Sequence, residues 1–252
     1  MNIKYFGNSL DLMKYDLLTH VLGGENRVLF YVPMLTPPKE KVEDPKYILY
    51  EMGRDNDSLY ELMNRVYKEN NPDFIEILEY FNLKGLSHKV VLPYSVGAVS
   101  DDVIPADFFT NDIRNHYFEK SLNEYKKITK DKLIFIDPDV GSDIGIVRRV
   151  RSMRNAYLKS SEIKDSIRAS RSNDIVCYFQ HLGNNRYSLD DRISDLKDEL
   201  GDLVLIAGFK KVLGSLVFIF RNKDQHDHVK KRLESYMEHY RNDKNKEQII
   251  LQ

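Results

Sequence analysis

The segment 133–141, Leu-Ile-Phe-Ile-Asp-Pro-Asp-Val-Gly, constrains the fold of this chain more than any other. Its first four residues are apolar and rich in β-branched and aromatic side chains, which predicts a buried strand of a parallel sheet. Pro138 and Gly141 end that strand and turn the backbone. Because ligands of open α/β sheets bind beyond the carboxyl ends of strands, Asp137 and Asp139 stand where chemistry is expected.

Length and composition bound the size of the core and exclude several classes of protein. The 252 residues, 42% of them hydrophobic, fit a single α/β domain over residues 1–241, followed by a frayed tail at 242–252. The formal net charge of −1 excludes a polycation, so any contact with nucleic acid needs a local basic patch. The single cysteine, Cys177, excludes an internal disulfide and is expected to be a buried strand residue.

The sequence offers no signal for a membrane or for export. A run of about 18 apolar residues, which a membrane-spanning helix needs, does not occur. The N-terminus lacks the apolar core of a signal peptide. We therefore expect a cytoplasmic protein that has no membrane partner.

Helical and strand patterns alternate along the chain. Apolar residues at helical spacing predict helices at 10–22, 59–66, 74–81, 113–128, 161–171, 189–200 and 224–240. Short apolar runs predict strands at 28–32, 90–92, 132–137 and 175–179, and an antiparallel hairpin at 203–220. Long loops are expected at 33–58 and 93–110. This order predicts an α/β fold with a Rossmann-like, mostly parallel sheet that ends in a C-terminal antiparallel β-hairpin.

Polar residues near the N-terminus recur at a spacing of three: Asn8, Asp11 and Lys14, preceded by Gly7. With this Gly-Asn-x-x-Asp-x-x-Lys pattern the chain resembles the 23S rRNA adenine-N6 methyltransferases of the RlmJ family. In that family the segment precedes the first strand and lines the cofactor pocket. The resemblance therefore implies a class I methyltransferase-like fold and a set of residues that bind S-adenosylmethionine: Asn8, Asp11, Lys14 and Tyr31.

The acidic strand end strengthens the resemblance. Asp-Pro-Asp-Val at 137–140 resembles the catalytic Asp-Pro-Pro-aromatic motif of that family, in the same order along the chain. A closer resemblance is to a set of uncharacterised prokaryotic proteins that pair both motifs with further residues, here Tyr157, Glu162 and Gln180-His181. Because Asp137 and Asp139 end one predicted strand and His181 ends its neighbour, where ligands bind, we expect these three residues to form the catalytic set.

Two departures from the family pattern change the expected chemistry. The turn after the first strand, 31–38, contains three prolines and no glycine, whereas a methyltransferase of this kind needs glycine for close approach to the cofactor. Val140 replaces the aromatic residue that stacks the target base, and Asp139 replaces the second proline. The additional carboxylate favours a substrate that carries an amine or is bound to a cation.

Structural alternatives stand beside each candidate. Asp137 and Asp139 also suit a simple turn. The three residues of the N-terminal pattern also suit a helix cap followed by an ordinary ion pair. A lone histidine is more often structural, although His181 ends the strand next to the acidic one. His226 and His228 lie on a charged helix, where a solvated face is the better interpretation.

The densest basic patch follows the acidic turn and comprises Arg148, Arg149, Arg151 and Arg154. Basic side chains beside an active crevice hold phosphate groups, so the patch predicts contact with a nucleic acid or a nucleotide. The alternative is a solvated loop that balances the acidic loop at 101–112.

Three functions remain open from the sequence. The first is an S-adenosylmethionine-dependent, methyltransferase-like enzyme acting on nucleic acid or nucleotide, with Asp137 accepting hydrogen bonds from the target amine. The second is a nuclease or phosphohydrolase that binds Mg²⁺ through Asp137, Asp139 and Asp143. The third is a non-catalytic binding protein of the same fold, which the missing glycine turn suggests. An active centre requires the acidic tip at 137–139 to project into an accessible hollow shared with the first helix.

Overall fold

The computed structural model describes residues 7–34, 56–68, 76–91, 111–144, 157–182, 189–209, 214–240 and 249–252. The helices are, in chain order, α1 (Ser9–Leu22), α2 (Asp57–Lys68), α3 (Glu76–Leu83), α4 (Asn111–Lys126), α5 (Ser160–Ala169), α6 (Leu189–Leu200) and α7 (Lys223–His239). The strands are β1 (Val28–Pro33), β2 (His88–Val90), β3 (Lys132–Asp137), β4 (Gly141–Ser142), β5 (Tyr157–Leu158), β6 (Ile175–His181), β7 (Val204–Phe209), β8 (Gly214–Ile219) and β9 (Ile249–Leu251).

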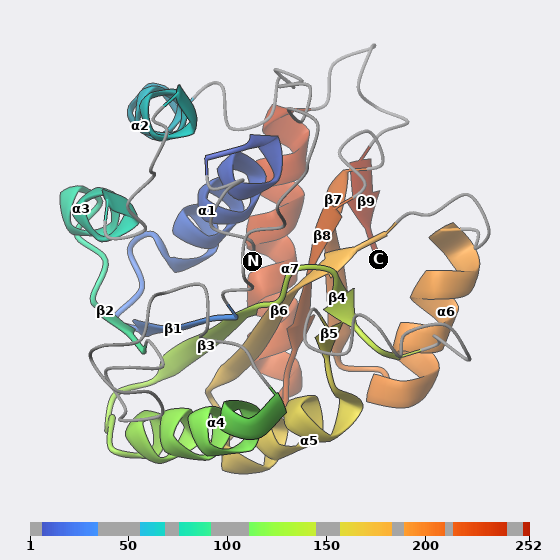
Figure 1. Ribbon diagram of the computed structural model, residues 1–252. Helices are drawn as coiled ribbons and strands as arrows, with labels where there is room; N and C mark the ends of the chain where they lie inside the picture. Colours follow the sequence, from blue (N-terminus) through green and yellow to red (C-terminus); the bar gives the residue numbers. More distant parts are fainter. Residues whose placement is uncertain are drawn as a thin grey trace.

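One central sheet joins strands from the beginning and the end of the described chain (Figure 1). Its strand order is β2-β1-β3-β6-β8-β7-β9. The first four strands in this order, β2, β1, β3 and β6, run parallel. Strand β8 is antiparallel to both of its neighbours, and β9 is antiparallel to β7. The predicted α/β class, with a mostly parallel sheet and a C-terminal antiparallel hairpin, is therefore confirmed, and the sheet as a whole is mixed.

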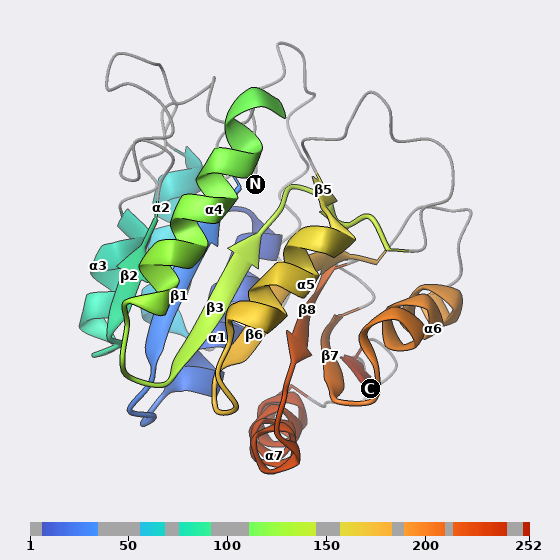
Figure 2. The same cartoon turned by 90° about the horizontal axis from the view of Figure 1, so that it is seen from below.

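Helices cover both faces of this sheet (Figure 2). Every residue of β1 and β3 is buried, as their apolar sequences require, and successive side chains point to opposite faces. Helices α1, α2, α3 and α7 pack on one face, which we call the α1 face. Helices α4, α5 and α6 pack on the other, the α6 face. Cys177 of β6 is fully buried on the α1 face, as predicted.

The strand order reverses between β1 and β3. From β1 the chain moves outward to β2 and then returns to β3 on the other side of β1. Open α/β sheets bind ligands beyond the carboxyl ends of strands at such a reversal. The last residues of the two strands there are Pro33 and Asp137, which pair in register. The acidic tip therefore lies at the edge of the sheet where a ligand is expected.

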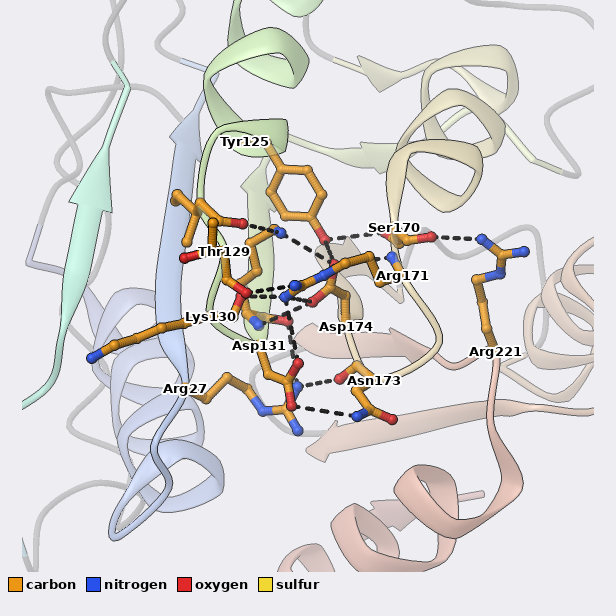
Figure 3. A network of polar contacts seen from close by, with 12 residues as sticks. Arg27, Tyr125, Thr129, Lys130, Asp131, Ser170, Arg171, Asn173, Asp174 and Arg221 are labelled. Carbon is orange, nitrogen blue, oxygen red and sulfur yellow. Dashed lines mark hydrogen bonds and ion pairs between the residues drawn. The ribbon is translucent and has the colours of Figure 1, made fainter.

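A network of polar contacts fastens the opposite, amino edge of the sheet (Figure 3). The Asp174 carboxylate accepts hydrogen bonds from the Lys132 amide (3.1 Å), the Arg171 amide (2.9 Å) and the Tyr125 hydroxyl (2.9 Å). Arg27 adds hydrogen bonds to backbone carbonyls beside it. These five residues, the amino-edge network, hold together the segments that enter β1, β3 and β6.

The structure corrects the expected C-terminal tail in part. The sequence predicts a frayed tail over 242–252, but Ile249–Leu251 forms β9, which pairs with β7. The physical reason is that β7 would otherwise present an open row of backbone donors and acceptors, and three consecutive apolar residues suit a strand there. The predicted strand at 90–92 also shifts, because β2 begins two residues earlier.

Several predictions fall outside the described residues. They include most of the loops expected at 33–58 and 93–110, and the basic patch of Arg148, Arg149, Arg151 and Arg154. Within the described ranges, none of the helices combines the length and the apolar character that crossing a membrane requires.

Candidate active site at the carboxyl edge of β1 and β3

The N-terminal pattern forms the first turn of α1. Gly7 has a φ of 94°, a conformation that favours glycine, and its amide donates to Asp11 Oδ2 at 2.9 Å. The Asn8 side chain caps the helix by accepting hydrogen bonds from the amides of Leu10 and Asp11, at 2.9 and 3.1 Å. The cap that the sequence offered as a structural alternative is therefore present, and it places Asp11 on the inner side of the helix.

Lys14 links this turn to the acidic strand end. Its ammonium lies 2.6 Å from Asp11 Oδ1, a buried pair three residues apart on the helix. It also donates to both oxygens of Asp137, at 2.9 Å to Oδ1 and 2.8 Å to Oδ2. The two motifs, 123 residues apart in the chain, therefore meet through a buried ion pair.

Asp137 is more enclosed than the sequence suggested. Its exposed fraction is 0%, whereas the sequence predicts that the acidic tip opens into an accessible hollow. The reason is that its side chain points to the α1 face, where the ammonium of Lys14 covers both oxygens. Burial of the carboxylate is tolerated because a charged donor satisfies it there.

Two buried tyrosines complete this group. The Tyr31 hydroxyl donates to Asp137 Oδ2 at 2.9 Å and shares a hydrogen bond of 2.8 Å with the Tyr15 hydroxyl. The Lys14 ammonium also lies 5.0 Å from the ring centre of Phe179 and 5.8 Å from that of Tyr15, within cation–π range. We call Asp11, Lys14, Tyr15, Tyr31 and Asp137 the carboxyl-edge cluster.

Burial and charge shift the ionisation of this cluster in definite directions. Burial alone lowers the pKa of Lys14, but the Asp11 and Asp137 carboxylates outweigh it, so the pKa is raised above 10.5 and the side chain is a firmly held cation. Burial raises the pKa of Asp11 above 3.8 even though Lys14 opposes the shift. Burial, followed by nearby carboxylates, raises the pKa of Tyr15 and Tyr31 well above 10, so both hydroxyls keep their protons.

After Asp137 the chain bends at Asp139 and Val140. Asp139 is half-buried, and it contributes to a raised pKa at Tyr157 after the larger effect of burial. Gly141 has a φ of 108°, and a Cβ there would lie 2.5 Å from Gln180 Nε2, so only glycine fits. Gln180 Oε1 in turn accepts hydrogen bonds from the amide and hydroxyl of Ser142. Because Asp139 is half-buried and Asp137 is fully buried, Asp139 is the more accessible of these two carboxylates.

His181 lies beside this turn, at the end of β6. Its amide donates to the Val140 carbonyl at 3.2 Å, and its half-buried ring packs edge-on against Phe179 at 6.4 Å. The backbone contact brings the ends of β3 and β6 together, as the sequence predicted. A catalytic role of the imidazole stays a prediction.

Two of the three carboxylates proposed for Mg²⁺ make separate structural contacts. Asp143 accepts a hydrogen bond of 2.8 Å from the Ser160 amide at the start of α5, and Asp137 is bound to Lys14. In the ranges that the structure describes, no group of three or more acidic, histidine or cysteine side chains is placed to hold a metal ion.

The segment that contains Tyr157 and Glu162 is held by a residue that no sequence motif indicates. Arg114 of α4 is fully buried, forms an ion pair with Glu162 and donates to the Tyr157 carbonyl. Arg192 and Tyr178 were also missed, although both are buried near the acidic turn. Their spacing on an amphipathic helix and in an apolar strand gives no signal that distinguishes them from ordinary helix and core residues.

The fold and this site define an α/β protein with a buried charged cluster at the reversal of strand order. A comparison of the chain with models of known protein families finds no match, and neither does a comparison with curated proteins.

Proposed function

We propose that this protein is an S-adenosylmethionine-dependent, methyltransferase-like enzyme that acts on nucleic acid or nucleotide at the carboxyl edge of β1 and β3. The observation that carries the proposal is the contact between Lys14 and Asp137, which joins both motifs of the resemblance at the reversal of strand order. The strand order supports it as well, because the class I methyltransferase sheet is Rossmann-like with an antiparallel strand near its C-terminus, as β8 is here; the short β9 is an addition at the edge beside β7.

The chemistry of the cluster suits a positively charged ligand group. The Lys14 ammonium already occupies the position between two carboxylates and two aromatic rings, and the two carboxylates outnumber this one cation, which favours a further cationic group beside the cluster. S-adenosylmethionine carries positive charge at its sulfur and its amino group, and when bound it supplies an electrophilic methyl group. In the proposal the cofactor lies beside the carboxyl ends of β1 and β3. Asn8 and Asp11 fix the turn of α1 that faces it, and the buried Tyr31 and Asp137 support this turn through Lys14.

The roles of the two aspartates differ in this proposal. Asp137 holds Lys14 and Tyr31 in position, because its oxygens already accept their hydrogen bonds. Asp139 takes the role of accepting a hydrogen bond from the target amine, since it is the less buried carboxylate. This revises the expectation that Asp137 itself contacts the amine.

Calorimetry with S-adenosylmethionine tests the proposal. We expect saturable binding by the wild-type chain and binding about tenfold weaker in Asp137→Asn, as for the loss of one hydrogen bond to a charged group. Asp174→Asn is the matched control, because Asp174 is an equally enclosed carboxylate at the opposite edge of the sheet. If folded wild-type protein gives no heat of binding at millimolar S-adenosylmethionine, the proposal of a transferase is wrong.

A second candidate is a non-catalytic binding protein of the same fold, and the complete burial of Asp137 favours it. An assay that measures the transfer of labelled methyl groups from S-adenosylmethionine to RNA or nucleotides distinguishes the two candidate functions. Transfer that disappears in Asp139→Asn, in a protein that still binds the cofactor, supports the enzyme. Cofactor binding without any transfer supports the binding protein.

A further inference from the structure

Arg192 makes fewer polar contacts than the other buried cations of the described chain. Lys14 contacts two carboxylates, Arg114 pairs with Glu162, and Lys132 lies 3.4 Å from an oxygen of Asp174. Arg27 forms no ion pair in the described residues, but it donates to two backbone carbonyls and to Gln225. Arg192 is only 7% exposed, yet within the described residues it forms no ion pair and makes one hydrogen bond, from Nη2 to the Ser142 carbonyl at 2.8 Å. A guanidinium has five N–H donors, so most of its capacity is unused.

A second buried donor lies nearby. Tyr178 of β6 has an exposed fraction of 0%, and among the described residues its hydroxyl has no hydrogen bond of normal geometry. Ser142 and Arg192 are its polar neighbours, and the Ser142 hydroxyl is already committed to Gln180. Burial raises the pKa of Tyr178, so the hydroxyl stays protonated and can donate.

Both donors lie next to the acidic turn. Arg192 is in the first turn of α6, which follows β6 and therefore begins at the carboxyl edge of the sheet. Its one acceptor, Ser142, comes three residues after Asp139. Tyr157, which pairs with Gly141, is influenced by the charges of both Arg192 and Asp139.

A buried hydroxyl without an acceptor, beside a largely buried guanidinium that makes one hydrogen bond in the described residues, indicates a missing acceptor. Arginine is almost never buried without a partner, and an unsatisfied buried group in a native structure calls for a bound ion, water or ligand. Asp143 and Asp195 influence Arg192 only at longer range, after burial and Tyr178. A guanidinium with free donors matches the tetrahedral oxygens of phosphate better than any neutral acceptor.

We propose that Arg192 and Tyr178 bind a phosphate group of the substrate, which is therefore a nucleotide or nucleic acid rather than an uncharged nucleoside. The assignment to a substrate rests on the proposed function, whereas the anion site itself does not. The carboxylate of the cofactor is a less suitable occupant, because Tyr31 and Asp137 of the cofactor side face α1, and Tyr178 faces α6.

Binding of inorganic phosphate tests the site directly. Thermal unfolding is followed in sodium phosphate and in sodium chloride of equal ionic strength. We expect the midpoint of the wild-type chain to rise saturably with phosphate only, and the apparent phosphate affinity to fall about tenfold or more in Arg192→Met. Arg192→Lys keeps the positive charge but loses the planar pair of donors, so its phosphate affinity should lie between those of the wild-type chain and Arg192→Met. Tyr178→Phe should weaken phosphate binding by a smaller factor than Arg192→Met.

The control variant is Arg168→Met, which removes a positive charge from a side chain that is 75% exposed on α5. It should leave the phosphate affinity unchanged. In phosphate-free buffer Arg192→Met should be at least as stable as the wild-type chain, because an unpaired buried charge is removed. Marked destabilisation there, with unchanged phosphate affinity in Arg192→Lys, would show a purely structural arginine and overturn the proposal.

Crystals soaked in sodium selenate give a second measurement. An anomalous peak within hydrogen-bonding distance of Arg192, absent in Arg192→Lys, supports the site, whereas peaks elsewhere alone mean an adventitious ion only and contradict it. Calorimetry with adenosine 5′-monophosphate and with adenosine tests the assignment to a substrate. The wild-type chain should bind the phosphorylated compound more tightly, and this preference must vanish in Arg192→Met. If phosphate binds through Arg192 but S-adenosylmethionine does not bind, the proposed function fails and the anion site stands.

Discussion

Two buried polar groups at opposite edges of one sheet use the same residue types in different ways. The carboxyl-edge cluster joins Lys14, Asp137 and Tyr31, and the amino-edge network (Figure 3) joins Lys132, Asp174 and Tyr125. In each, a lysine and a tyrosine contact one aspartate. The difference lies in how many other groups share the contacts.

The amino-edge network is redundant. Asp174 accepts from two backbone amides as well as from side chains, and Lys132 also donates to the Ile128 carbonyl at 2.8 Å. In the carboxyl-edge cluster one ammonium, that of Lys14, serves two buried carboxylates from distant parts of the chain. Redundant local contacts are typical of a structural fastener, whereas charge concentrated on one side chain at a ligand edge is typical of a site.

The largest expected difference between the two edges comes from removing the lysines. Lys14→Met leaves Asp11 and Asp137 without the ammonium that both contact, and we expect a loss of about 3–5 kcal/mol in the free energy of unfolding. Lys132→Met should cost only about 1–2 kcal/mol, because Asp174 keeps its other donors. Urea unfolding at neutral pH measures both, and equal losses would contradict the difference in redundancy.

Glycine substitutions compare the backbone at the two edges. Gly141→Ala combines a φ of 108° with a Cβ placed 2.5 Å from Gln180, so a loss of about 2–4 kcal/mol is expected. Gly201, before β7 at the amino edge, has a φ of 88°, and nothing lies within 4 Å of the position that a Cβ would take, so Gly201→Ala should cost about 1–2 kcal/mol. Chemical denaturation of both variants measures how much the contact of the new Cβ with Gln180 adds to the loss of stability. A larger loss for Gly201→Ala than for Gly141→Ala would contradict this contribution.

Removing the tyrosine hydroxyls separates stability from binding. Tyr31→Phe and Tyr125→Phe each delete a hydrogen bond of 2.9 Å to a buried aspartate, and both should cost about 1–2 kcal/mol. Under the proposed function only Tyr31→Phe also weakens the binding of S-adenosylmethionine. Denaturation and calorimetry on the same preparations test this, and equal effects of the two substitutions on cofactor affinity would argue against the site.

The smallest effect is an opposite response of the two edges to acid. Burial raises the pKa of Asp11, so its stabilising contribution is complete below 3.8 and is lost as the pH rises through the pKa of the folded state. For Asp174 burial acts upward, but hydrogen bonds from Arg171 and Tyr125 outweigh it and lower the pKa. Its contribution is present above 3.8 and is lost as the pH falls.

Urea midpoints of Asp11→Asn and Asp174→Asn between about pH 3 and pH 6 measure these slopes, which are at most about 1.4 kcal/mol per pH unit for one proton. The deficit of Asp174→Asn relative to the wild-type chain should shrink as the pH falls. Asp11→Asn should gain relative stability as the pH rises. Parallel slopes for the two variants would contradict the assigned directions.

Local sequence patterns predicted much of the fold. The strand that ends at Asp137, the hairpin of β7 and β8 and the buried Cys177 follow from apolar runs and their periodicity, because such runs are stable only between two covered faces. The pairing of Ile249–Leu251 with β7 could not be predicted, because the sequence of a short apolar segment does not show which strand of the sheet has an open edge.

The candidate site divides in the same way. Neighbouring residues in the sequence are enough to specify its local devices: the cap at Asn8, the ion pair of Asp11 with Lys14 and the glycine turn at Gly141. The contact of Lys14 with Asp137 and the burial of Arg192 beside the acidic turn arise only in the folded chain. Such contacts depend on which strand ends become neighbours when the sheet assembles, and the packing of the whole chain sets this rather than any short segment.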